Sequence, residues 1–382
     1  MLLSIISLRL EAAYMKRLTA LVVLAMVLVV SVVPVNAQVP AHESALEWLR
    51  QTQEPSGGFS NGFSEGADFG ATVEVILAAV ASGQDASLWI TPQGNSPLDF
   101  VRAEVAAGRA SDVGDLSRAL LVAVATGQDP RSFGGRDLVA ALSAQQDAAT
   151  GMFAGDLFKH AYALLALHNA GVAIPDSAVR AMTSQFTEDG AWALFGGTEP
   201  GTADTNTTAL VMQALVAAGE VNAAAGALAY LRAVQNEDGG FPYQNPSPWG
   251  TDTDSNSTAL VIQALNALGE PMGDWAGSGT DPVGAVMALW DQASGAFYWQ
   301  ASVPVANPLA TAQSAQAVAG MTLVNLPRVG AAGAQPVAEA VVPLMPASGF
   351  DVVSGSLLLM GAIIVLVAFS ALLRKKSSAR EV

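Results

Sequence analysis

The chain repeats itself six times, and this internal repeat limits the possible folds more than any other feature. Six Ala-rich apolar segments each end at a glycine: Gly83, Gly127, Gly171, Gly219, Gly269 and Gly320. Successive glycines are 44 to 51 residues apart. A glycine directly after an apolar helical run is typical of a helix C-terminus, because glycine adopts the left-handed conformation easily. A period of this length predicts one supersecondary unit per repeat, stacked against its neighbours.

Each repeat is predicted to be a helical hairpin. Five repeats carry a Gly-aromatic turn ahead of the final helix: Gly57-Gly58-Phe59, Gly151-Met152-Phe153, Gly190-Ala191-Trp192, Gly239-Gly240-Phe241 and Gly295-Ala296-Phe297. The second repeat has only Gly108-Arg109-Ala110 near that place. Another helical pattern precedes the turn, as in residues 223–235, where Leu228, Leu231 and Val234 share an apolar face. The order is therefore helix, turn, helix, and no strand is predicted.

The second helices of the hairpins favour a closed ring over an open solenoid. Residues 258–268, for example, are nearly all apolar and small, which suits burial on most sides. An open solenoid needs polar capping repeats at its ends. We therefore predict an all-α fold over residues 38–325, a closed double ring with the second helices inside.

Three short stretches resemble a known superfamily. Residues 235–241, which read QNEDGGF, are similar to the QW-type repeat of the terpenoid cyclase and protein prenyltransferase superfamily. The stretches that start at Asp204 and Asp254 resemble the beginning of its inner helices. The resemblance covers about residues 43–324 and implies an α/α toroid of six hairpins. It does not imply one function, because the superfamily includes cyclases, prenyltransferases, thioester domains and cobalamin carriers.

The two ends of the chain predict export and anchoring. Residues 1–37 read as a signal peptide, with Met15 as an alternative start, because Lys16-Arg17 precedes an apolar run and a small-x-small cleavage site. Residues 326–351 form a Pro/Ala-rich linker. Residues 352–373 carry no charge and are long enough to cross a bilayer, and the basic tail 374–382 should stay cytoplasmic. We expect a secreted ectodomain anchored in the cell membrane; a retained N-terminal anchor and sortase processing near residues 345–349 are the alternatives.

Composition excludes several classes of function. The 382 residues carry a formal net charge of −16, which argues against nucleic-acid binding. The chain has no Cys, so it cannot form a thioester or the Asp-Cys-His zinc site that the resemblance to prenyltransferases would imply. His160 and His168 lie eight residues apart, too far to share a metal from one helix. No metal and no cofactor are predicted, and both histidines are expected to be packing or solvated residues.

The resemblance also allows a test for cyclase chemistry. Class II cyclases protonate an alkene with the middle carboxylic acid of a D-x-D-D-T-A motif. Alignment on Thr208 and Thr258 places Asn206 and Asn256 at that position, and an amide cannot deliver the proton. Asp204 and Asp254 remain as weak catalytic candidates, although capping of a helix N-terminus is the favoured explanation for both.

Asp252 is the third weak catalytic candidate. With Asp254 and Asn256 it also resembles the start of a calcium loop. Ser257 and Gln263 stand where that loop needs Gly and Glu, so calcium is not expected.

Aromatic residues gather in the turns between first and second helices, and therefore at one end of the predicted ring. We expect ligand contacts from five of them: Trp192, Tyr243, Trp249, Tyr298 and Trp299. Trp192 directly follows its turn, where packing under its own hairpin is the competing explanation. A mouth lined by such rings suits a small apolar ligand, a corrinoid such as cobalamin, or a glycan.

Three functions are compatible with these features. The first is a surface-anchored protein that binds a small apolar or corrinoid-like ligand or a partner, and that leans toward no catalysis. The alternative is an extracellular enzyme on the same fold, either terpenoid cyclase-like or a carbohydrate-active lyase or hydrolase, with carboxylates from Asp204, Asp252, Asp254 and Asp115. The third is an adhesion module that uses the repeat surface as an interface.

Overall fold

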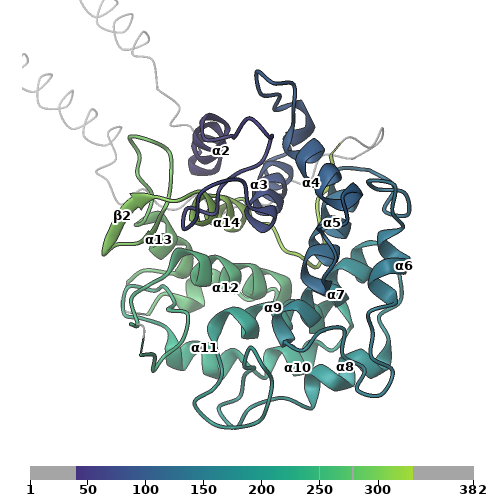
Figure 1. Cartoon of the computed structure of the whole chain (residues 1–382). Coiled ribbons are helices and arrows are strands. Elements are labelled where there is room, and N and C mark those ends of the chain that lie inside the picture. Colours follow the sequence, from purple (N-terminus) through teal and green to yellow (C-terminus); the bar gives the residue numbers. More distant parts are fainter. Residues whose placement is uncertain (1–39, 249, 278, 330–382) are drawn as a thin grey trace, which may run out of the picture.

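Six inner helices form a closed ring in the computed structural model, which describes residues 40–248, 250–277 and 279–329. They are α3 (Phe69–Ala81), α5 (Val113–Ala125), α7 (Leu157–Asn169), α9 (Thr205–Ala217), α12 (Ser255–Leu268) and α14 (Pro308–Val318). Each packs against the next, and α14 packs against α3 (Figure 1). The predicted closed ring of six hairpins is therefore confirmed for the described residues.

An outer layer of shorter helices surrounds this ring. Its members are α2 (Ala41–Gln51), α4 (Pro97–Ala106), α6 (Leu138–Ser143), α8 (Asp176–Thr183), α10 (Val221–Ala225), α11 (Leu228–Val234) and α13 (Pro282–Met287), with short 3-10 turns at Ala86–Leu88 and Met272–Trp275. The outer helix of a hairpin packs behind the inner helix of the preceding hairpin, as α4 does on α3 and α2 on α14. The single helix predicted over residues 223–235 is instead two helices, because the first ends at Gly226.

One short sheet was not predicted. β1 (Tyr298–Gln300) and β2 (Val303–Ala306) form an antiparallel hairpin after the last Gly-aromatic turn. The two segments are rich in aromatic and β-branched residues, which favour extended backbone. The prediction of no strands is therefore wrong at this point, and the hairpin packs beside α12 and α14.

All six inner helices begin in the same way. Their N-cap residues are Asp68, Asp112, Asp156, Asp204, Asp254 and Asn307. Each N-cap side chain accepts a hydrogen bond from the backbone N–H three residues further on. This bond satisfies one of the N–H groups that a helix start leaves unpaired. The caps therefore mark six equivalent positions, at the end of the ring that we call the mouth.

The Gly-aromatic turns join each hairpin to the next. Gln235 donates from Nε2 to the carbonyl of Gly239 in its own turn (2.9 Å) and to that of Trp275 in the next hairpin (2.9 Å). Gln53 and Gln146 make the same kind of bridge. Position 239 requires glycine, because the φ of Gly239 is +87° and a Cβ added there would lie 2.1 Å from the Thr280 carbonyl oxygen.

The end of the ring opposite the mouth is covered by residues 321–329. Asn169, the last residue of α7, donates to the Leu323 carbonyl (2.8 Å) and accepts from the Leu326 N–H (3.2 Å). Val329 N–H donates to the carbonyl of Ala125, the last residue of α5 (2.9 Å). Residues 321–329 therefore cross the carboxyl ends of the inner helices.

The predicted signal peptide (1–37), most of the linker (326–351), the membrane segment (352–373) and the basic tail (374–382) lie outside the described residues. Within the described ranges, every helix is too short or too polar to cross a membrane.

Candidate functional site

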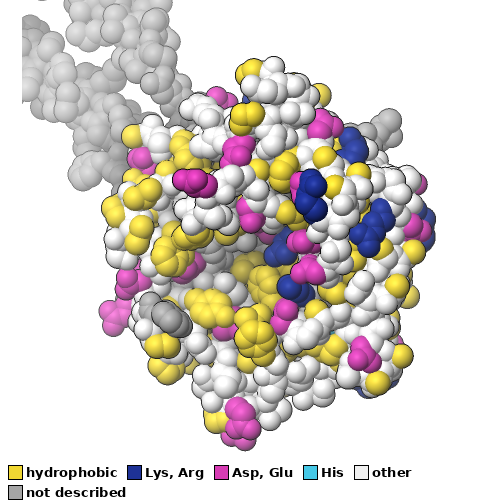
Figure 2. Space-filling model, in the orientation of Figure 1, with side chains coloured by type: hydrophobic (Ala, Val, Ile, Leu, Met, Phe, Trp, Pro, Cys, Tyr) yellow, Lys and Arg dark blue, Asp and Glu magenta, His cyan; other side chains and the backbone are white. Residues whose placement is uncertain are grey.

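A cavity of about 450 Å³ opens at the mouth of the ring. Figure 2 shows this face hollowed at its centre, with apolar, acidic and basic side chains together on the walls of the hollow. Five of the six N-terminal helix turns contribute to its lining, together with the loop at Phe63 and the β-hairpin residue Trp299. The mouth is therefore a chemically mixed site surrounded by the inner helices.

Two positions of the inner helices make most of the cavity wall. They are the second and the sixth residue after the N-cap, which share one face because they are four residues apart. The second position contributes Gly70, Phe158, Asn206, Asn256 and Leu309, and the sixth contributes Glu74, Arg118, Leu260 and Gln313. The same two positions of the repeat therefore line the site in most of the inner helices.

Three polar side chains at the sixth position, Glu74, Arg118 and Tyr162, lie on consecutive inner helices, and Tyr162 contacts the other two. The buried Glu74 accepts a hydrogen bond from the Tyr162 hydroxyl at Oε1 (3.1 Å) and from Gln316 Nε2 at Oε2 (2.8 Å). The Arg118 guanidinium lies over the Tyr162 ring, 4.7 Å from its centroid. Burial, with the Glu74 charge nearby, raises the pKa of Tyr162, so the hydroxyl keeps its proton and donates it. Glu74 is therefore arranged as a hydrogen-bond acceptor.

Asp254 supplies a second carboxyl group with different surroundings. It caps α12, and its Oδ2 accepts a hydrogen bond from Trp299 Nε1. Only 6% of Asp254 is exposed, and burial raises the pKa of its carboxyl. A raised pKa favours the protonated form of a carboxyl group, which is the form that can donate a proton. Asp254 is therefore the candidate proton donor of the cavity.

Aromatic rings form one side of the opening. The rings of Phe63 and Trp299 meet edge to face, with centroids 5.6 Å apart. Phe63 is 63% exposed, although a large apolar ring is usually buried in a soluble protein. Together with Phe158 these rings offer apolar faces to a molecule in the cavity.

The three carboxylates predicted from the sequence lie in three different surroundings. Asp254 lines the cavity, as described above. Asp204 is 2% exposed and caps α9, and burial raises the pKa of its carboxyl to about 6. It does not line the cavity, whereas its neighbour Asn206 does. Asp252 is exposed and accepts from the Ser302 hydroxyl (3.1 Å), and it lines a different groove.

The five aromatic residues predicted to contact a ligand also lie in different surroundings. Trp299 lines the cavity, and Tyr243 is 40% exposed outside it. Tyr298 is half-buried on β1, and Trp249 lies outside the described residues. Trp192 is a correction: it is fully buried, donates from Nε1 to the Met182 carbonyl (3.0 Å) and packs on Phe186. It holds its own hairpin together and offers no surface to a ligand.

His160 has a packing role. Its Nδ1 accepts from the Phe153 N–H (3.0 Å), and its Nε2 lies 3.0 Å from the Ala178 carbonyl. In four other hairpins, a Thr hydroxyl at the same position accepts the N–H of the turn aromatic: Thr72, Thr208, Thr258 and Thr311. Among the described residues no three His, Asp or Glu side chains are arranged to hold a metal ion.

Sequence reasoning missed Glu74, Arg118, Asp68 and Phe63, which all line the cavity. The signal that finds the first two is present in the sequence. Aligning the repeats on their N-caps and reading the sixth following residue gives Glu74, Arg118 and Tyr162 in three successive repeats. This signal is visible only when equivalent positions of all six repeats are compared, because the fourth and fifth repeats carry Leu210 and Leu260 there.

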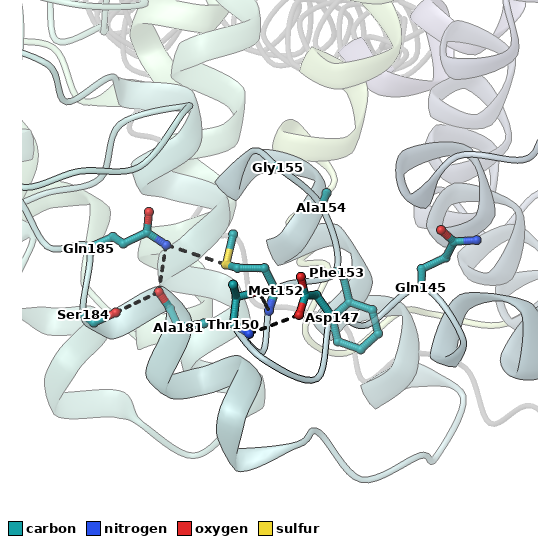
Figure 3. Close-up of a pocket in the computed structure, with 10 residues that line it drawn as sticks. All are labelled: Gln145, Asp147, Thr150, Met152, Phe153, Ala154, Gly155, Ala181, Ser184 and Gln185. Carbon is teal, nitrogen blue, oxygen red and sulfur yellow. Dashed lines mark hydrogen bonds between the residues drawn. The ribbon is translucent and has the colours of Figure 1, made fainter.

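A larger groove of about 640 Å³ lies on the outside of the ring, between the Gly-aromatic turn of the third repeat and α8 (Figure 3). Its polar groups serve the local fold. Asp147 accepts from the N–H groups of Ala149 (2.7 Å) and Thr150 (3.2 Å), and Gln185 donates to the Ala181 carbonyl (2.8 Å). The mouth, where functional groups converge from separate helices, is therefore the better candidate site.

Comparison with known proteins defines the fold class first: the chain is an α/α toroid, as its resemblance to that fold implied. The crystal structure of an unsaturated glucuronyl hydrolase specific for heparin superposes with a TM-score of 0.51 at 12% sequence identity, covering 73% of this chain and 95% of that chain. No protein-family model and no curated protein matches the sequence.

This comparison corrects one expectation. The sequence leaned toward a toroid without catalysis. A solved protein with the same fold is a hydrolase, which contradicts that leaning and favours the enzymatic alternative. The similarity itself concerns the fold, so the residues of the mouth must carry any argument about the reaction.

Proposed function

We propose that this chain is a carbohydrate-active enzyme that hydrolyses a glycosidic bond in the cavity at the mouth of the toroid. The observation that carries the proposal is the pair of carboxyl groups, Glu74 and Asp254, which reach one cavity from different inner helices. Glycoside hydrolysis generally uses two such groups, one to protonate the leaving oxygen and one to act on the anomeric carbon or on water.

The surroundings of the two groups assign their roles. Asp254, whose pKa is raised by burial, donates a proton to the glycosidic oxygen as the C–O bond breaks. Glu74 takes a proton from the water molecule that adds to the anomeric carbon. The hydrogen bonds from Tyr162 and Gln316 fix the Glu74 carboxylate for this role. The products are two shorter sugars. Glu74 then releases the proton that it gained to solvent and Asp254 regains one from solvent, so that one water molecule is consumed in each cycle.

The rest of the cavity suits a sugar ring. The faces of Trp299 and Phe63 can stack on its C–H groups, and the amides of Asn206, Asn256 and Gln313 can exchange hydrogen bonds with its hydroxyls. The Asn206 side chain lines the cavity, and its buried Oδ1 atom has no hydrogen-bond partner among the described residues. The predicted export signal supports action on an extracellular glycan.

Cyclase chemistry fits this site less well. Asn206 and Asn256 occupy the positions of the alkene-protonating acid in the resemblance, and both side chains line the cavity as amides. The similar solved structure is a hydrolase whose substrate carries an unsaturated glucuronyl group, which supports hydrolysis of a glycan as the reaction type.

The test is cleavage of a panel of neutral and acidic oligosaccharides by the full-length protein, measured as new reducing ends. Glu74→Gln and Asp254→Asn should each lower turnover by roughly 100- to 10,000-fold, because each removes proton transfer while keeping shape. Asp156→Asn is the matched control, since Asp156 caps α7 in the same way but does not line the cavity. Unchanged turnover in both variants, or no cleavage of any glycan, would overturn the proposal.

A further inference from the structure

Arg118 lines the cavity and forms no direct ion pair among the described residues, although Glu74, Asp115 and Asp112 lie near enough to raise the pKa of its guanidinium. No Asp or Glu oxygen of the described residues lies within 4.0 Å of its guanidinium, whereas Lys159 Nζ is 3.0 Å from Asp112 Oδ2 and 4.0 Å from Asp156 Oδ2. The Nε atom of Arg118 is buried and has no hydrogen-bond partner among the described residues. Keeping an arginine in this state costs free energy unless another group satisfies its donors.

Two glycines make room for the Arg118 side chain beside the cavity. At the second position after the N-cap, α3 and α5 carry Gly70 and Gly114, where the other inner helices carry larger side chains. A Cβ on Gly114 would lie 3.2 Å from Arg118 Nη1, and one on Gly70 would lie 3.9 Å from Arg118 Nε. The guanidinium therefore reaches along α5 toward the mouth, because helical side chains point toward the N-terminus.

The charged groups around Arg118 are occupied with other partners. Glu74 accepts from Tyr162 and Gln316, and Asp112 pairs with Lys159. Asp115 is half-buried, and its pKa is raised by burial and by the neighbouring Asp112 charge. The planar fork of an arginine matches the two oxygens of a carboxylate. The Tyr162 ring under the guanidinium limits its orientation.

We infer that Arg118 binds a carboxylate of the substrate, so that a uronic acid unit occupies the mouth. This inference rests on the proposed function and adds the substrate class. Glu74, Asp68 and Asp254 line the same cavity as acids, and Arg118 is the one Lys or Arg side chain among the described residues that lines it, so an anion is accepted at the Arg118 guanidinium. The sugar is thereby oriented, with its carboxylate on α5 and its apolar face toward Phe63 and Trp299.

The test compares binding of glucuronate and its neutral isostere glucuronamide to the full-length protein by calorimetry. We expect glucuronate to bind about tenfold more tightly, the effect of one charge-assisted pair. Arg118→Gln should abolish this preference, and Arg118→Lys should keep part of it, because the charge remains but the fork is lost. Arg232→Gln is the matched control, since Arg232 also stacks on an aromatic ring, Trp275, but lies in the outer layer.

Equal binding of the two sugars, no binding of either, or a preference that survives in Arg118→Gln would overturn the inference. If Arg118→Gln does not fold, Arg118→Lys and the wild-type comparison decide the matter. Because the measurement needs no turnover, the two proposals fail separately. Cleavage of neutral glycans without a glucuronate preference removes only the inference, whereas a glucuronate preference without cleavage of any glycan removes only the proposed hydrolysis.

Discussion

At the scale of single residues, an aspartate at the start of an inner helix can cap that helix alone or can also line the cavity. The sequence favours capping as the role of Asp204 and Asp254, and both make the capping hydrogen bond. Only Asp254 also lines the cavity, because Trp299 from the β-hairpin closes over it. A cap position therefore identifies the mouth of the ring, but it does not identify which caps contact a ligand.

His160 gives a prediction for stability against pH. Burial lowers the pKa of His160 below its usual 6.5, so below that pH the unfolded chain binds a proton that the folded chain does not. The contribution of His160 to stability is therefore present above pH 6.5 and lost as the pH falls. His160→Thr, which copies the other hairpins, should flatten the decrease in unfolding free energy between about pH 7 and 5. Urea unfolding at several pH values measures this pH dependence of the unfolding free energy.

The same experiment has an internal control of opposite sign. Burial raises the pKa of Asp204 to about 6, so its contribution to stability decreases as the pH rises toward that value. Asp204→Asn should remove this dependence and make the acid-side decrease steeper. For His160, parallel curves of unfolding free energy against pH in wild type and His160→Thr would contradict the prediction, because they would show that His160 titrates alike in the folded and unfolded chain.

At the scale of elements, the Gly-aromatic turn fixes the spacing of neighbouring hairpins. Gly151 and Gly295 make the same close approach as Gly239: a Cβ would lie 2.4 Å from the Ser177 carbonyl oxygen or 2.6 Å from that of Ser44. The last of these contacts joins the sixth hairpin to the first. The outer layer is therefore closed by the same contact that joins its other members.

Gly239→Ala should destabilise the fold by about 3–5 kcal/mol, because the new Cβ overlaps the Thr280 carbonyl and the backbone has to move. Gly219→Ala separates this crowding from conformational strain. Gly219 has a similar φ of +83° but no atom within 4 Å of an added Cβ, so it should cost only about 1–2 kcal/mol. Chemical denaturation measures both, and equal losses would contradict the crowding argument.

At the scale of the whole molecule, the ring has one open end and one covered end. The covering segment is held by long-range contacts: Asn169 bonds to Leu323 and Leu326, and Gln213 Oε1 accepts from the Leu323 N–H (2.8 Å). The inner helices are apolar on nearly every face, so an uncovered end would expose their last turns to water. The segment therefore completes the core of the toroid.

Asn169→Ala tests this role. It leaves the Leu323 carbonyl and the Leu326 N–H without these partners, and we expect a loss of about 2–4 kcal/mol. Amide hydrogen exchange over residues 321–329 should become faster than in wild type. Asn222→Ala, at an exposed position on α10, is the control. Unchanged protection in residues 321–329 would show that the segment is held without Asn169.

The repeat, the helical hairpin and the closed ring could all be predicted from local features of the sequence. Glycine spacing, apolar inner helices and the turn motif are local signals, and each recurs often enough to be read without a structure. The β-hairpin and the break at Gly226 escaped this reading, because each occurs once and interrupts the repeat.

The residues of the site could not be predicted in this way, because they meet only when distant helices pack together. Glu74 and Gln316 are 242 positions apart and share a hydrogen bond across the ring closure. Six equivalent positions converge at the mouth, and whether they fill it or leave a cavity depends on the combined size of six side chains. Two glycines at the second position make room for the Arg118 guanidinium, and Glu74 and Arg118 at the sixth position make the cavity wall polar. Local periodicity places a residue inside the ring, but packing between distant helices decides whether it lies in the core or faces a ligand.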